Sequence, residues 1–142
     1  MLQVNWVAVL AATVAAFIVG FIWFGPKTFY PVWFRALGRS PQVSSSTNAA
    51  ALFVPTFIAT VLQALGVALI IGLRHGSGTH VGPVRGLIIG TLIGVLFAAA
   101  PSLGHRLFSG QGYRVWAIES GGDIAGLAVM GLVIGAFNGV GS

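Results

Sequence analysis

Residues 116–131 read WAIESGGDIAGLAVMG, and this stretch holds both acidic residues of the chain, Glu119 and Asp123. The two carboxylates are four positions apart, so on a helix they share one face. They lie at the start of an apolar run, about residues 116–137, that is long enough to cross a bilayer. The pattern predicts a membrane-spanning helix around which the rest of the chain packs.

The composition fits a bilayer rather than water. Hydrophobic residues make up 56% of the 142 residues and charged residues only 6%, whereas soluble domains carry roughly 25% charged residues. The net charge of +5 comes from seven Lys and Arg that lie in connectors and at helix ends, so we expect no nucleic-acid partner. The chain has no cysteine, which excludes disulfides and thiolate metal sites. No cofactor is expected.

Four apolar runs predict an all-α integral membrane protein, a single transmembrane domain over residues 1–142. The expected spans are about residues 4–24, 50–73, 84–100 and 116–137. Pro101 is expected to end or kink the third span, and residues 105–114, HRLFSGQGYR, to form the turn that follows.

A short amphipathic helix is expected in the interface plane, at about residues 28–38, after the first span. Phe29 and Trp33 recur there at helical spacing, with basic residues on either side. Together with Trp23 they are predicted to be interfacial anchors. A role in lipid sensing or gating is the alternative to this anchoring role.

Small residues recur at four-residue spacing and predict close helix packing. The strongest repeat is Gly86, Gly90 and Gly94 in the third span. The other glycines assigned to packing are Gly20 in the first span and Gly122 and Gly126 in the fourth.

Two groups of residues resemble a known family. The first is Gly20-x-x-Trp23-Phe24-Gly25-Pro26-x-x-Phe29, followed by Trp33 and Gly38; the second is Leu107-Phe108, Ile118, Gly121 and Met130-Gly131. The chain resembles the domain of unknown function 1761 family of small bacterial membrane proteins. The resemblance implies four spans and no established function. In those members the last helix begins with neutral polar residues or a histidine, whereas this chain has Glu119 and Asp123.

The basic residues indicate the orientation in the membrane. The first and third connectors carry five Lys and Arg, among them Arg39, and the second carries Arg74 and Arg85. The positive-inside rule therefore places both termini outside the cytoplasm. The resemblance to a bacterial family implies that the membrane is the inner membrane. His75 and His80 then lie across the bilayer from Glu119, so no metal site is expected.

The two acids have three possible roles. If the hydrocarbon begins near Trp116, Asp123 lies about 10 Å inside it, where a lone carboxylate costs about 3 kcal/mol or more. In the structural interpretation, the acids pair with Arg35, Arg106 or Arg114 near the helix N-terminus. In the second, they form an ion or proton site. Catalysis is the third, and because no nucleophile accompanies the acids, we expect no enzyme.

For function, the small-residue stripes favour a non-enzymatic membrane protein that acts by helix association, as a homo-oligomer or an accessory subunit. Its partners would be the lipid bilayer and either itself or another membrane protein. The alternative is a small proton- or cation-linked transporter or channel that uses Asp123 and Glu119.

Overall fold

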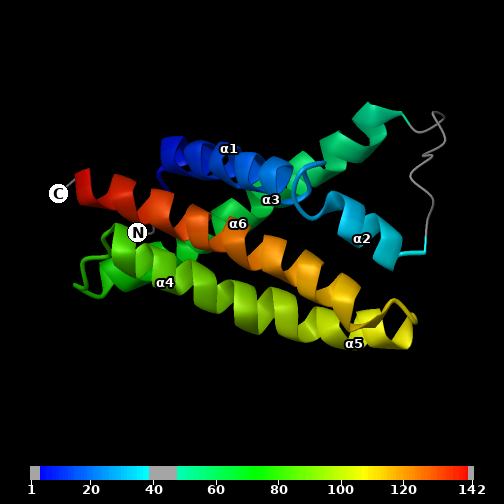
Figure 1. Cartoon of the computed structure of the whole chain (residues 1–142). Coiled ribbons are helices and arrows are strands. Elements are labelled where there is room, and N and C mark those ends of the chain that lie inside the picture. The colour runs from blue at the N-terminus through cyan, green and yellow to red at the C-terminus, as the bar shows by residue number, and fades with distance from the viewer. Residues whose placement is uncertain (1–3, 39–47, 141–142) are drawn as a thin grey trace.

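In the computed structural model, which describes residues 4–38 and 48–140, the chain is a bundle of helices (Figure 1). Four helical stretches are long and apolar enough to span a membrane, which confirms the four-span all-α prediction. The start of α1 and the end of α6 lie at the same end of the bundle (Figure 1). The elements in order are α1 (Trp6–Trp23), α2 (Tyr30–Ala36), α3 (Ala49–Gly76), α4 (Pro83–Ile93), the π-helix η1 (Gly94–Ala99), α5 (Ala100–Phe108) and α6 (Gly112–Val140).

The helix with the two acids, α6, is central and lies between α1 and α4 (Figure 1). Its buried side chains Leu127, Met130 and Ile134 meet a small-residue face of α1 and an apolar face of α3. The outer faces of the spans expose large apolar side chains, which suits contact with lipid tails. The partners buried with α6 are Ala8, Val9, Ala12 and Ala16 of α1 and Ala64, Val67 and Ile71 of α3.

The closest helix contact is between α4 and α6, at the glycine repeat. A Cβ added at Gly90 would collide with the carbonyl oxygen of Leu127, and one at Gly86 with that of Gly131. A Cβ at Gly94 would lie 2.8 Å from Cα of Ile124. Because glycine has no side chain, the two backbones approach more closely here than any other residue permits.

The third span differs from its prediction because Pro101 does not end it. Proline has no N–H to donate, and the helix before it widens into η1, in which the Ala100 N–H bonds to the Val95 carbonyl. The helix then continues as α5 to Phe108, and the turn is confined to the residues before Gly112. The prediction of a turn from residue 105 was therefore wrong, and Arg106 lies on a helix.

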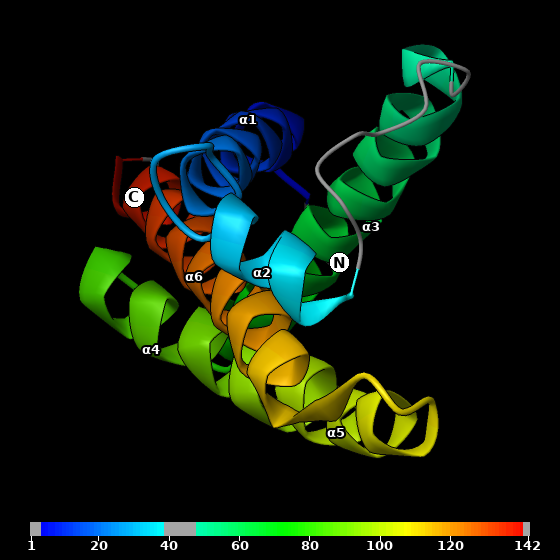
Figure 2. The same ribbon diagram turned by 45° about the vertical axis from the view of Figure 1, so that its right-hand side comes forward.

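α3 packs against α6 along only part of its length. Thr60, Ala64, Val67 and Ile71 share one face of α3, and Asp123, Leu127, Met130 and Ile134 have the same spacing on α6. The last three of each set are buried, but Thr60 is half-buried and Asp123 is exposed. The N-terminal half of α3 leans away from α6 (Figure 2).

That half of α3 contacts α1 instead. The rings of Phe17 and Phe57 are 5.7 Å apart, and those of Phe21 and Phe53 are 6.1 Å apart. Asn48 caps the helix by accepting a hydrogen bond from the Ala50 N–H. The connector before Asn48, with Arg39, lies outside the described residues.

Candidate functional site

Glu119 joins three helices. Its Oε2 forms an ion pair with Nε of Arg106 on α5, and its Oε1 accepts a hydrogen bond of 3.0 Å from the indole Nε1 of Trp33 on α2. Arg106 supplies an opposite charge and Trp33 a hydrogen-bond donor, so the negative charge of Glu119 is compensated within the chain. The continuation of the helix past Pro101 as α5 is what brings Arg106 to this position.

The other two arginines considered for this role are placed elsewhere. Arg35 is exposed, and its Nε donates to the Pro31 carbonyl at 3.1 Å within α2. Arg114 is also exposed; it lies in the first turn of α6, about 7 Å before Glu119 along the helix axis. Neither arginine forms an ion pair within the described residues. On α2 it is Trp33, not Arg35, that reaches the carboxylate of Glu119.

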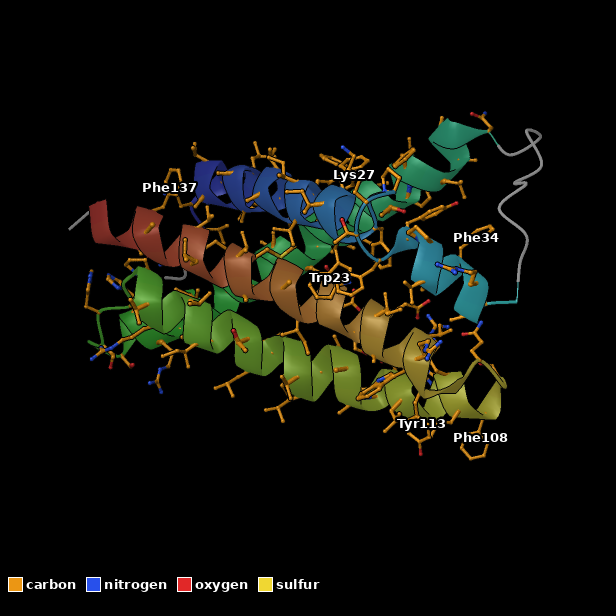
Figure 3. All side chains as sticks on the ribbon, viewed as in Figure 1. Trp23, Lys27, Phe34, Phe108, Tyr113 and Phe137 are labelled. Carbon is orange, nitrogen blue, oxygen red and sulfur yellow. The ribbon has the colours of Figure 1, made fainter. Side chains whose placement is uncertain are left out.

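The aromatic residues predicted as lipid anchors make contacts inside the protein. Trp23 lies between α1 and α6 (Figure 3), and its Nε1 donates to the Ile118 carbonyl at 2.8 Å. Its ring centroid is 4.6 Å from that of Phe29. Trp33 is likewise half-buried and bonded to Glu119. These residues therefore attach the end of α1 and the helix α2 to α6, whatever contact they also make with lipid.

Glycines on α6 receive the end of α1. A Cβ at Gly121 would lie 2.6 Å from Cζ2 of Trp23, and one at Gly122 would lie 3.0 Å from Cδ1 of the same ring. The first span thus ends beside Gly121 and Gly122. Two of the glycines assigned to packing, Gly20 and Gly126, differ: no atom lies within 4 Å of a Cβ added at either, so neither is a point of close approach in the described structure.

The end of α1 changes the depth expected for the acids. α1 has 18 residues and is about 27 Å long, close to the roughly 30 Å of the hydrocarbon core. A hydrocarbon boundary at the end of α1 leaves Glu119 at the interface and Asp123 within about one helical turn of it. Asp123 is therefore nearer the membrane surface than the depth of about 10 Å that a boundary at Trp116 gives.

Asp123 has no ion-pair partner in the part of the chain that the structure describes, and it is exposed. On α3, the face that would otherwise cover it presents hydroxyl groups. Thr60 and Thr56 both donate to their own helix backbone, at 2.8 and 2.6 Å, so their free lone pairs can only accept. Gln63 is exposed next to them. A group that compensates Asp123 here must be cationic or donate a hydrogen bond.

A polar cluster that the sequence did not reveal lies where η1 becomes α5. The Ala99 carbonyl accepts bonds of 2.9 Å from Nε1 of Trp116 and from Oγ of Ser102. Ser102 Oγ is 3.3 Å from Oγ of Ser120, which is only 3% exposed. Trp116 and Ser120 belong to α6, so the cluster joins the middle of the third span to α6. No local sequence pattern signals it, because its residues come from separate helices.

The histidines form no centre with the acids. His75 is in the last turn of α3 and His80 in the connector that follows, and their rings are 5.9 Å apart. The end of α3 and the start of α4 lie at the other end of the bundle from the start of α6 (Figure 1). Among the residues that the structure describes, no three His, Asp or Glu side chains are grouped as metal ligands.

Comparison with known proteins gives one match. The family described as "Protein of unknown function (DUF1761)" matches residues 7–135. No curated protein and no solved structure matches the chain.

Proposed function

We propose, from the premise that this chain belongs to the DUF1761 family of proteins of unknown function, that it acts by association within the membrane. It would do so as a self-assembled complex or as an accessory subunit of a larger one. The family match and the four spans define a multi-pass membrane protein. The proposal adds the cell inner membrane, both termini outside the cytoplasm, and no enzymatic activity of its own.

The observation that carries the proposal is the uncovered face between α6 and the N-terminal half of α3. Asp123 and Gln63 are exposed there, next to the exposed apolar residues of α3. Polar side chains at this depth are costly in contact with lipid and are satisfied by protein or by water. A neighbouring chain that covers this face would supply both partners.

The glycine repeat no longer supports association. Gly86, Gly90 and Gly94 are used inside the bundle, against the backbone of α6. Gly20 and Gly126 remain available, since the space beside them is open. A bulky residue at Gly126 therefore tests association, whereas a bulky residue at Gly90 would disrupt the fold itself.

The test is the native mass of the protein after gentle extraction from its own membrane, with its companions identified. A homo-oligomer or a fixed-ratio complex supports the proposal, and Gly126→Leu should lower the fraction of the protein found in that assembly. A lone monomer in both native nanodiscs and mild detergent would overturn it. Gly104→Leu is the matched control, because a Cβ at Gly104 also meets no atom within 4 Å but lies on α5, away from this face.

A second candidate, proton- or cation-linked transport, is favoured by one observation. Arg106 compensates Glu119, while Asp123 has no ion pair within the described residues, as expected for a group that binds a proton or cation reversibly. In proteoliposomes, Asp123→Asn should abolish flux and leave the assembled protein intact. Flux that survives this change would exclude Asp123 as the coupling group.

A further inference from the structure

Two opposite charges remain unpaired near the end of the first span. Lys27 and Asp123 are both exposed, and neither forms an ion pair within residues 4–38 and 48–140. The side chain of Lys27 lies on the side of α1 that faces away from α6 (Figure 3), so it is not directed toward the Asp123 of its own chain.

The two charges lie at nearly the same depth. The turn that carries Lys27 is fixed, because the Phe29 N–H bonds to the Trp23 carbonyl at 3.1 Å and the Thr28 N–H to the Gly25 carbonyl at 3.0 Å. Trp23 in turn packs on Gly121, which is two residues, or about 3 Å, from Asp123. Lys27 is thus within about one helical turn of the level of Asp123.

An open glycine lies beside the acid. Gly126 follows Asp123 by three residues on α6, so the two lie on neighbouring parts of one helix face. A Cβ added at Gly126 meets no atom within 4 Å. The acid therefore has beside it a position where another helix can approach closely.

Copies of one membrane protein insert in the same orientation, so residues meet across their interface only at equal depth. We infer that this chain self-assembles through Lys27 of one copy against Asp123 and Gly126 of the next. This interface is heterologous, the kind that closes into a ring. The inference rests on the proposed association and names its partner as a second copy of the chain.

The interface explains the uncovered acid. The hydroxyls of Thr56 and Thr60 already donate to their own helix, so they cannot donate to Asp123. The ammonium group of Lys27 carries positive charge and donates hydrogen bonds. Its flexible four-carbon side chain can bridge a difference in level of about one helical turn. Arg114 is about 13 Å from the level of Asp123 along α6, so it does not serve this purpose.

Charge exchange tests the pairing. In proteoliposomes or nanodiscs, Lys27→Glu and Asp123→Lys should each weaken self-association by about tenfold, and the double variant should restore it. Arg35→Glu, a charge reversal on α2, is the control and should leave self-association unchanged. Helical circular dichroism and a single elution peak show that each variant is folded.

Cysteine cross-linking supplies a second measurement, since the chain has no cysteine of its own. Copies that carry Lys27→Cys and differently tagged copies that carry Asp123→Cys should cross-link as a mixed dimer with a short bismaleimide. Copies that carry Arg114→Cys in place of Lys27→Cys should not. These variants keep most of the surface intact and do not depend on charge reversal.

The outcomes separate this inference from the proposed function. If the protein is a homo-oligomer whose mass is unchanged by both charge reversals, and no mixed cross-link forms, the pairing of Lys27 with Asp123 is overturned but the proposed association is not. A complex with a different protein and a single copy of this chain also overturns the pairing. A lone monomer overturns both.

Discussion

Gly90→Ala tests whether α4 and α6 hold together by direct backbone contact. A methyl group at this position would collide with the Leu127 carbonyl oxygen and lie 2.8 Å from its carbon and 3.1 Å from Cα of Ala128. All three are backbone atoms, so no side chain can rotate away. The helices must separate, and the neighbouring contacts at Gly86 and Gly94 separate with them.

Overpacking of this kind costs about 1–3 kcal/mol. The matched control is Gly126→Ala on the partner helix, where the added methyl group meets no atom within 4 Å. There alanine should be neutral or should stabilise the helix by up to about 1 kcal/mol, because glycine is a poor helix former. Both substitutions add one methyl group, so the difference between their effects on the free energy of unfolding reports the close contact between α4 and α6.

The assay is reversible unfolding in mixed micelles, followed by tryptophan fluorescence, with both variants compared with the wild type. Gly90→Ala should lower the free energy of unfolding by at least 1 kcal/mol relative to Gly126→Ala. Equal unfolding midpoints for the two variants would refute the close backbone contact between α4 and α6.

Three further predictions concern the contacts of α6. Glu119→Gln removes the ion pair with Arg106 and should destabilise the protein by about 1–3 kcal/mol, and a double-mutant cycle with Arg106→Gln should give a coupling energy above about 0.5 kcal/mol; additive effects would contradict the pair. Gly121→Ala places a methyl group 2.6 Å from the ring of Trp23, so tryptophan fluorescence should shift as the indole is displaced, and an unchanged spectrum would argue against that contact. Trp116→Phe removes the donor to the carbonyl in the π segment, so hydrogen exchange around η1 should accelerate while that of α1 stays at the wild-type rate; equal protection would show that the indole does not stabilise the segment.

The interior arrangement of the third span shows the limit of local rules. Pro101 is a helix breaker by its own chemistry, yet the helix widens into η1 before it and continues as α5 after it. The same fact decides the partner of Glu119. With a turn at residue 105, three arginines were equal candidates; with α5 continuous, only Arg106 faces the carboxylate.

The sequence by itself determined the class of protein, the four spans and the helix on which the acids lie, because hydrophobic length and residue spacing are properties of one segment at a time. Which glycines meet a backbone, which arginine pairs with Glu119, and that Asp123 is left uncovered were decided only by the tertiary structure. These features depend on the angle and offset between helices. The N-terminal half of α3 leans away from α6 (Figure 2), and the sequence of neither helix alone shows where the two separate.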